Sequence, residues 1–139
     1  MAGPVYITRR EQFSAAHRLF KPELSDEENL KLFGKCSNPN WHGHNYVLEV
    51  VVAGEVNPAT GFVMDLKELK DIVRENVISK VDHKNLNVET DFMDGKIASS
   101  ENIVIAIWNV LVKKIKHGKL YSVKLFETEN NYFEYKGEE

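Results

Sequence analysis

The sequence contains one cysteine, no long apolar run and no excess of positive charge. The single cysteine, Cys36, excludes an intramolecular disulfide. No segment approaches the roughly 20 apolar residues that a membrane span needs, and the first residues lack the apolar core of a signal peptide. We therefore expect a cytoplasmic protein that keeps its thiol reduced and does not bind a membrane.

The charges of the chain are nearly balanced, with 18 lysines and arginines against 21 aspartates and glutamates. Such a balance provides no broad basic surface, so we do not expect nucleic acid as a partner. The chain has 139 residues, of which 42% are hydrophobic. This length and composition predict a single domain over residues 1–139 with a core of its own.

Hydrophobic periodicity divides the chain into two strands, two main helices and two further strands. The order favours antiparallel pairing with the helices on one face, which defines the α+β class. We expect a four-stranded antiparallel sheet whose two open edges need cover, for example from another subunit. The expected strands are 5–20 (bulged near its middle), 44–56, 121–128 and 132–136; the expected helices are 65–81 and 100–117, with a short one at 24–33.

Polar residues mark the ends of the two main helices. Asp65 and Glu68 have the spacing of a capping box. Ser99 or Ser100 can cap the second helix, and Gly118 is the residue type that commonly follows a helix end. These signals support the two helices independently of their apolar faces.

Three histidines can meet if the first two strands pair. His42 and His44 are two residues apart, so in an extended segment both rings point the same way, about 7 Å apart. His17 lies on the preceding strand, and antiparallel pairing brings it across from them. Three neutral imidazoles suit zinc, although His-Gly-His alone is also found in ordinary loops. The sequence therefore predicts a zinc site at the end of this strand pair.

Cys36 leaves three interpretations open. As a fourth ligand it would close a structural site, whereas three histidines alone leave a metal position open for substrate, as catalytic zinc sites do. In the third interpretation the thiol is a small buried apolar side chain. The residues alone do not choose among these roles.

Two acidic positions are further candidates. Asp82 can orient the adjacent His83 for proton transfer, although such a pair just past a helix is also typical of a solvated surface. Glu127, at an inward strand position, can accept two neighbouring N–H groups of a pterin or guanine edge. The alternative for Glu127 is an ordinary surface residue.

Six segments resemble the 6-pyruvoyl-tetrahydropterin synthase family, in order and over nearly the whole chain. They are FSAAHRL, LFGKCSNPNWHGHNY, NPATGFVMDL, DHKNLN, SSEN and FETENN. The five residues between Cys36 and His42 favour this family over the 6-carboxy-tetrahydropterin synthases, in which the gap is shorter. The resemblance implies a T-fold (tunnelling fold), whose subunits join their sheets into a trimeric barrel, with two trimers stacked into a homohexamer.

The resemblance also implies roles for individual residues. Cys36 is implied as the catalytic general base, with Asp82 and His83 handling its proton. Glu127 is implied as the anchor of the pterin ring. Trp41 departs from the family pattern, in which glycine often precedes His-Gly-His. The implied ligands of one Zn²⁺ per subunit are His17, His42 and His44, and the segment near the pterin pocket is Ser99, Ser100 and Glu101.

The implied reaction converts 7,8-dihydroneopterin triphosphate to 6-pyruvoyl-tetrahydropterin with elimination of triphosphate, a step of tetrahydrobiopterin biosynthesis. Zinc would act as a Lewis acid on the substrate side chain, from which Cys36 would remove a proton. Mg²⁺ is a second cofactor candidate because it can accompany the triphosphate. The basic candidates for holding the triphosphate are Arg9, Arg10, Arg18 and Lys35.

Two alternatives remain open at this point. A 6-carboxy-tetrahydropterin synthase or a dihydroneopterin aldolase-like enzyme would use the same fold and zinc site and form a different product. A protein without enzymatic activity would hold a purely structural zinc in an oligomeric binding module. Product analysis separates the first alternative, and metal removal the second, because a structural zinc is needed for folding.

Overall fold

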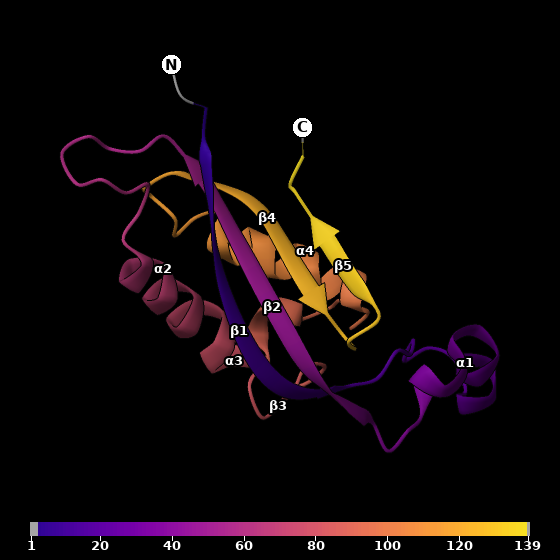
Figure 1. Cartoon of the computed structure of the whole chain (residues 1–139). Helices are drawn as coiled ribbons and strands as arrows, with labels where there is room; N and C mark the ends of the chain where they lie inside the picture. Colours follow the sequence, from indigo (N-terminus) through magenta and orange to yellow (C-terminus); the bar gives the residue numbers. More distant parts are fainter. Residues whose placement is uncertain (1–2, 139) are drawn as a thin grey trace.

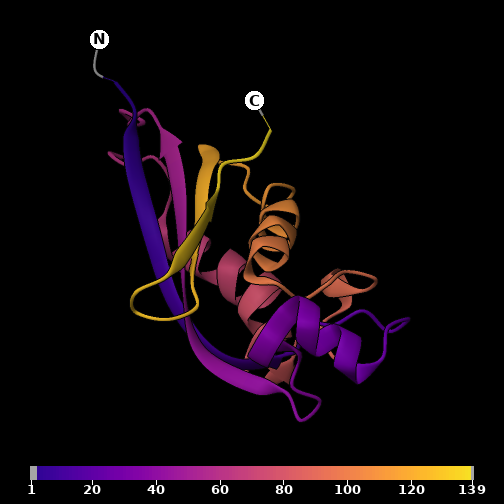
Figure 2. The same cartoon turned by 90° about the vertical axis from the view of Figure 1, so that its right-hand side faces the viewer.

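In the computed structural model, which describes residues 3–138, a five-stranded sheet carries the helices on one side (Figures 1 and 2). The strand order is β3-β1-β2-β4-β5. The strands are β1 (Val5–His17), β2 (His42–Gly54), β3 (Lys84–Asn85), β4 (Lys119–Phe126) and β5 (Tyr132–Tyr135). The helices are α1 (Asp26–Phe33), α2 (Leu66–Val73), α3 (Ser79–Val81) and α4 (Ser100–Leu111).

The α+β class is confirmed, but the prediction of a four-stranded antiparallel sheet is wrong. The sheet is mixed, because β3 pairs with β1 in parallel while the other pairs are antiparallel. After α3 the chain runs along the end of β1, where the Ala16 carbonyl accepts the Leu86 N–H at 2.8 Å. A strand of two residues is too short to produce an alternating pattern in the sequence.

The pairing of β1 with β2 sets the geometry of the molecule. Its register runs without interruption from Val5 opposite Gly54 to His17 opposite His42. The bulge expected in the first strand is therefore wrong, and the irregularity lies instead between Val51 and Val52 of β2, opposite β4. At the His17 end both strands curl toward the helix side (Figure 2).

The main helices begin where the capping residues predict. Asp65 accepts the Lys67 N–H at 2.9 Å at the start of α2, and Ser99 accepts the Asn102 N–H at 3.2 Å at the start of α4. The expected capping-box role of Glu68 is wrong, since its carboxylate contacts His117 Nδ1 at 3.1 Å. α2 continues into α3 through a π turn, η2 (Arg74–Ile78).

The end of the last helix differs from its prediction. α4 ends at Leu111, and Gly118 lies several residues further on, just before β4. Gly118 has a φ of 69°, a left-handed conformation that glycine adopts without strain. The glycine therefore shapes the turn into β4 rather than the end of the helix.

The core lies between the helices and the inner face of the sheet. Alternation along β1 and β2 points one set of side chains toward the helices and the other set away. Leu66, the first residue of α2, lies outside this core and is 56% exposed. The main buried residues are Phe13, Tyr46, Leu48, Val50 and Val52 from the sheet and Leu69, Val73, Val77, Ile103, Ile107 and Leu111 from the helices. Within residues 3–138, no helix is long and apolar enough to cross a membrane.

Candidate active site

The three predicted histidines lie together on the inner face of the sheet, at the curled end of β1 and β2. His17 is directly opposite His42 in the register, and His44 is two residues further along β2. One ring nitrogen of each histidine lies within 4.8 Å of those of the other two. The strand pairing thus brings the trio together as the sequence predicted, and the three residues form a group that can hold a metal ion.

The hydrogen bonds of the trio leave ring nitrogens free to bind a metal. His17 Nδ1 lies 2.7 Å from the Ala98 carbonyl oxygen, which can only accept, so Nδ1 carries the proton and Nε2 presents a lone pair. His17 Nε2, His42 Nδ1 and His44 Nε2 are all buried without a hydrogen-bond partner among the described residues. Buried polar atoms are normally paired, so three converging nitrogens of this kind fit a bound cation.

The environment favours the neutral, metal-binding form of the histidines. Burial lowers the pKa of His17, and neighbouring His42 and His44 lower it further. Burial also lowers the pKa of His42, followed by the effect of His44. Protons therefore compete with a metal for these two rings only at a lower pH than they would in the unfolded chain.

Glu127 lies beside the trio at the end of β4. Its Oε1 is 3.8 Å from His44 Nε2, which is longer than a hydrogen bond. Its Oε2 accepts a hydrogen bond from the Ser100 hydroxyl in the first turn of α4. Ser100 is buried and helps to orient the carboxylate, whereas Ser99 is used as the helix cap and Glu101 is exposed.

Tyr46 was missed by the sequence reasoning, although it continues the inward alternation of His42 and His44. Its side chain is fully buried; the ring stacks on Phe13 with centroids 4.9 Å apart and meets the His44 ring edge-on at 5.6 Å. The hydroxyl is buried without a hydrogen-bond partner among the described residues, which typically costs about 1–3 kcal/mol. Burial, followed by the charges of Glu127 and Cys36, raises the pKa of Tyr46 far above its usual range, so the phenol is neutral.

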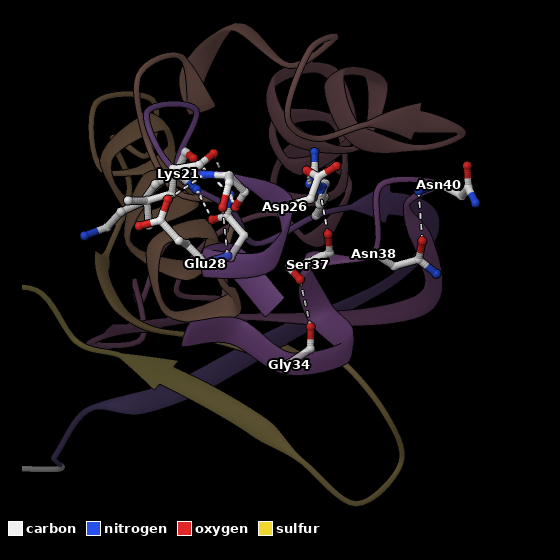
Figure 3. A network of polar contacts seen from close by, with 11 residues as sticks. Lys21, Asp26, Glu28, Gly34, Ser37, Asn38 and Asn40 are labelled. Carbon is white, nitrogen blue, oxygen red and sulfur yellow. Dashed lines mark hydrogen bonds and ion pairs between the residues drawn. The ribbon is translucent and has the colours of Figure 1, made fainter. Parts of the chain in front are cut away.

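Cys36 lies in the 3₁₀ turn η1 (Gly34–Ser37), which is fixed to the end of β1. The Cys36 carbonyl accepts the Leu19 N–H at 2.8 Å, and the Ser37 carbonyl accepts the Arg18 Nε–H at 2.7 Å. The Ser37 hydroxyl donates to the Gly34 carbonyl at 2.9 Å, closing the turn (Figure 3). The thiol is half-buried and lies outside the group of metal-binding side chains, so the structure supports a three-histidine group without it.

Trp41 lies in the loop that joins η1 to β2. Asn38 organises this loop: its side-chain oxygen accepts the Asn40 N–H at 2.9 Å (Figure 3), and its carbonyl accepts the Trp41 N–H at 3.0 Å. Trp41 has a φ of 66°, which is strained for any residue with a Cβ. Its ring packs edge-on against Phe20 at 6.1 Å between centroids, so aromatic packing holds a conformation that glycine would adopt freely.

Asp82 and His83 lie on the other side of β1 from the trio. The Ser14 N–H donates to Asp82 Oδ1 at 2.9 Å, and this bond, with further contributions from His83, lowers the pKa of Asp82. His83 Nδ1 is 3.1 Å from Asp82 Oδ1, and the His83 side chain is 82% exposed. His83 borders a groove of about 480 Å³, whose lining also includes Ser14, Ala16, Gly43, His44 and Asn45. It therefore faces outward at the β3 edge.

Two of the predicted triphosphate-binding cations are engaged in ion pairs. Arg9 pairs with the buried Glu11, and Arg18 pairs with Asp26 at 3.1 Å while its guanidinium lies 4.1 Å from the centre of the Phe20 ring. Arg10 is more loosely paired, because its Nε lies 4.0 Å from Glu49 Oε2 and its side chain is 63% exposed. Lys35 borders an apolar groove beside α1.

Fold and site define an α+β protein in which three histidines that can hold a metal ion lie beside an oriented carboxylate. The sequence profile described as 6-pyruvoyl tetrahydropterin synthase matches residues 6–138. The human 6-pyruvoyl tetrahydrobiopterin synthase is 51% identical over 132 residues, covering 95% of this chain and 91% of the human one. The Dictyostelium discoideum protein of the same name is 48% identical over 138 residues, covering 99% and 100%.

The solved structure of the Caenorhabditis elegans 6-pyruvoyl tetrahydropterin synthase superposes on this chain with a TM-score of 0.91. It shares 42% sequence identity, covering 99% of this chain and 100% of that one. The chain thus belongs to the 6-pyruvoyl tetrahydropterin synthase family. The predictions of the family and of a lyase are confirmed.

Proposed function

We propose that this chain converts 7,8-dihydroneopterin triphosphate to 6-pyruvoyl-tetrahydropterin and triphosphate, in tetrahydrobiopterin biosynthesis in the cytoplasm. The observation that carries the proposal is the trio of His17, His42 and His44, whose buried nitrogens converge beside Glu127. A metal position next to an anchoring carboxylate suits a substrate with a pterin ring at one end and an oxygen-rich side chain at the other.

The proposed metal is one Zn²⁺ per subunit, because three imidazole nitrogens are a common ligand set of catalytic zinc. When bound there, zinc supplies Lewis-acid polarisation to the oxygens of the substrate side chain. Mg²⁺ is a second candidate, as a counterion of the triphosphate. Within the trio, the proton on His17 Nδ1, held by Ala98, keeps Nε2 available as a ligand.

The chain's own residues would hold the substrate and move its protons. Glu127 accepts two neighbouring N–H groups of the pterin ring, and Ser100 fixes the orientation of this carboxylate. Ser99 contributes indirectly by capping α4, and Glu101 lies in the same turn. Ring binding at Glu127 directs the substrate side chain toward the trio.

Cys36, as a thiolate, takes a proton from a side-chain carbon, in keeping with its place outside the histidine group. The electrons of that C–H bond pass into the C=N bond of the dihydropterin ring, which takes up a proton. A second proton is then lost from the side-chain carbon next to the one that bears the triphosphate. The electron pair of this C–H bond forms a carbon–carbon double bond, the carbon–oxygen bond to the triphosphate breaks, and the triphosphate leaves with the electron pair of that bond. The resulting enol takes up a proton on its terminal carbon and becomes the ketone of the pyruvoyl group. The redox change is internal to the substrate, so the reaction needs no external oxidant or reductant.

Asp82 and His83 would act in the site of a neighbouring subunit, because the His83 side chain is 82% exposed and neither residue belongs to the histidine group of its own chain. Open sheet edges support such an assembly: in the described residues, β3 covers β1 only at Ala15 and Ala16. β5 likewise ends the sheet on the other side. Joining these edges between subunits gives the proposed T-fold barrel, a trimer that stacks into a homohexamer.

The test is incubation of the purified protein with 7,8-dihydroneopterin triphosphate, with and without a chelator. We expect release of triphosphate and formation of the 6-pyruvoyl product, both abolished by the chelator and restored by zinc. A 6-carboxy or 6-hydroxymethyl product would overturn the proposed reaction in favour of the alternatives. Unfolding on metal removal, measured by circular dichroism, would point instead to a structural metal.

A further inference from the structure

We propose that Tyr46 is a further substrate-binding residue, whose buried hydroxyl donates a hydrogen bond to an oxygen of the substrate's hydroxylated side chain. The inference rests on the proposed function, since it concerns a ligand that joins a pterin ring to such a side chain. Tyr46 lies on the inner face next to the trio, and the proposed reaction does not use its hydroxyl.

Tyr46 lies between the two ends of the candidate site. On β2 it follows His44 by two residues, so both side chains point to the helix side of the sheet. On the neighbouring β4, Phe126 pairs with Val47, and Glu127 comes directly after Phe126, next to the Tyr46 position. The tyrosine is therefore flanked by the proposed metal ligands on its own strand and by the proposed ring anchor on the adjacent strand.

The ring that carries the hydroxyl is held in place, but the hydroxyl has no hydrogen-bond partner within residues 3–138. The ring is fixed by stacking on Phe13 and by its edge contacts with His44 and His17. The hydroxyl oxygen is buried and makes no hydrogen bond with the described residues. A fixed, neutral and unpaired donor next to a binding site is suited to a ligand acceptor.

The surroundings of the hydroxyl favour the side chain of the ligand over its ring. Both carboxylate oxygens of Glu127 are assigned to ring N–H groups, which are donors and cannot pair with a second donor. The carbon that loses its proton to Cys36 carries or adjoins the side-chain oxygens, which are acceptors.

The test compares Tyr46→Phe with the unchanged protein, using two ligands in equilibrium binding with zinc-loaded protein. 7,8-Dihydroneopterin carries the hydroxylated side chain, and 6-methyl-7,8-dihydropterin has the same ring without it. We expect Tyr46→Phe to bind dihydroneopterin roughly tenfold more weakly, the usual effect of one lost hydrogen bond, and to bind the methyl compound unchanged. Tyr135→Phe is the matched control, because Tyr135 packs on Trp108 at a distance from the trio.

Three results would overturn the proposal. The first is equal affinity of Tyr46→Phe for dihydroneopterin, and the second is an equal loss for both ligands. The third is a changed rate of Cys36 alkylation in ligand-free Tyr46→Phe together with unchanged binding of dihydroneopterin. That result would mean that the phenol influences the thiol and not the ligand. Zinc content and thermal unfolding of the ligand-free variant are measured in parallel. The zinc content should match that of the unchanged protein, and the thermal stability should be equal or higher, because the hydroxyl that is removed is unpaired.

A second measurement needs no substitution. In protein labelled with ¹³C at tyrosine Cζ, the Tyr46 signal should shift on binding dihydroneopterin and not on binding the methyl compound. An unshifted signal would also overturn the proposal. If the unchanged protein binds neither ligand, the proposed function itself fails; if it binds both and Tyr46→Phe behaves identically, only the role of Tyr46 fails.

Discussion

The histidine trio and the Asp82–His83 pair lie on the same strand end and differ in almost every physical respect. The trio lies on the inner face, with His17 buried and His42 and His44 half-buried, and it is held by the unbroken register of β1 and β2. The pair lies on the outer side of β1, and the His83 ring is largely exposed. The first region is assembled within a single chain, whereas the role proposed for the second requires a neighbouring subunit.

The position of a site residue can be predicted from one chain where strand geometry alone fixes the direction of its side chain. Residues two apart on paired strands face the same side by geometry, so the trio follows from the covalent sequence and one strand pairing. The direction of His83 depends on a left-handed backbone, with a φ of 59°, in a short irregular segment. The chemical role of the His83 side chain depends on which groups of another molecule lie against it.

Removal of one ligand of the trio should have the largest effect. We expect His42→Ala to lose its zinc and roughly a thousandfold or more in turnover, equivalent to about 4 kcal/mol of transition-state stabilisation. His117→Ala is the control, because His117 is exposed and contacts only Glu68 in the described structure. Metal analysis and triphosphate release measure the effect; a metal-free His42→Ala of normal turnover would contradict the assignment.

Mixing two inactive variants tests whether the two regions act together across subunits. Cys36→Ala and His83→Ala should each lose about 10²–10⁴-fold in rate while keeping zinc. When subunits of both variants are unfolded and reassembled together, about a quarter of the sites at a shared interface should regain both residues. Activity that stays at the level of the separate variants would mean that one chain supplies both groups.

The two regions should also respond to pH in different ranges. In the metal-free protein, the lowered pKa of His17 means that the unfolded chain takes up protons near 6.5 and the folded chain does not. The contribution of neutral His17 to the free energy of unfolding is therefore present above about pH 6.5. It is lost as pH falls toward the pKa of His17 in the folded chain, by at most about 1.4 kcal/mol per pH unit for one proton. The lowered pKa of Asp82 also makes the protein less stable as pH falls, but this loss of stability begins only below the usual aspartate pKa of 3.8.

Urea unfolding of the metal-free protein at pH 7, 5.5 and 4 measures this response. The free energy of unfolding should fall between pH 7 and 5.5, and a His17→Gln variant should show a smaller fall. Saturation with zinc should oppose the loss in the unchanged protein, because the ion binds the same neutral nitrogens. A flat profile between pH 7 and 5.5 would show that His17 does not titrate differently on folding.

The smallest effect concerns the backbone next to the trio. Trp41 has a left-handed φ, as His83 does, but its ring is packed on Phe20. Trp41→Gly and Trp41→Ala both lose that packing, and only the glycine removes the backbone strain. We expect Trp41→Gly to be about 1 kcal/mol more stable than Trp41→Ala in thermal unfolding. Equal stabilities would mean that the loop relaxes when the ring is removed.

Much of the fold and the trio could be predicted because they depend on local periodicity. The caps at Asp65 and Ser99 were correct, since a side chain that bonds the first turn acts over a few residues. Tyr46 was predictable from its alternation with His44 but was overlooked among the strand-forming residues. β3 left no pattern, because its two residues pair only through tertiary placement.

The mutual placement of Glu127 and Ser100 required the folded chain. They are far apart in sequence, and their contact depends on how α4 packs against the end of β4. The resemblance to the family suggested both residues as part of a pterin site, and the structure shows which hydroxyl of the serine pair reaches the carboxylate. Ser99 and Ser100 are adjacent at the start of α4. The sequence alone therefore does not show which serine caps the helix and which one contacts Glu127.

The positions of the chain ends have a practical consequence. β1 begins at Val5 and runs 13 residues before it reaches His17, a length of about 40 Å. β1 begins and β5 ends at the far end of the sheet from the trio (Figure 1). A fluorescent reporter or an affinity handle attached beyond β1 or β5 would therefore be joined to the sheet far from the candidate site, which suits tethering of the protein to a sensor surface.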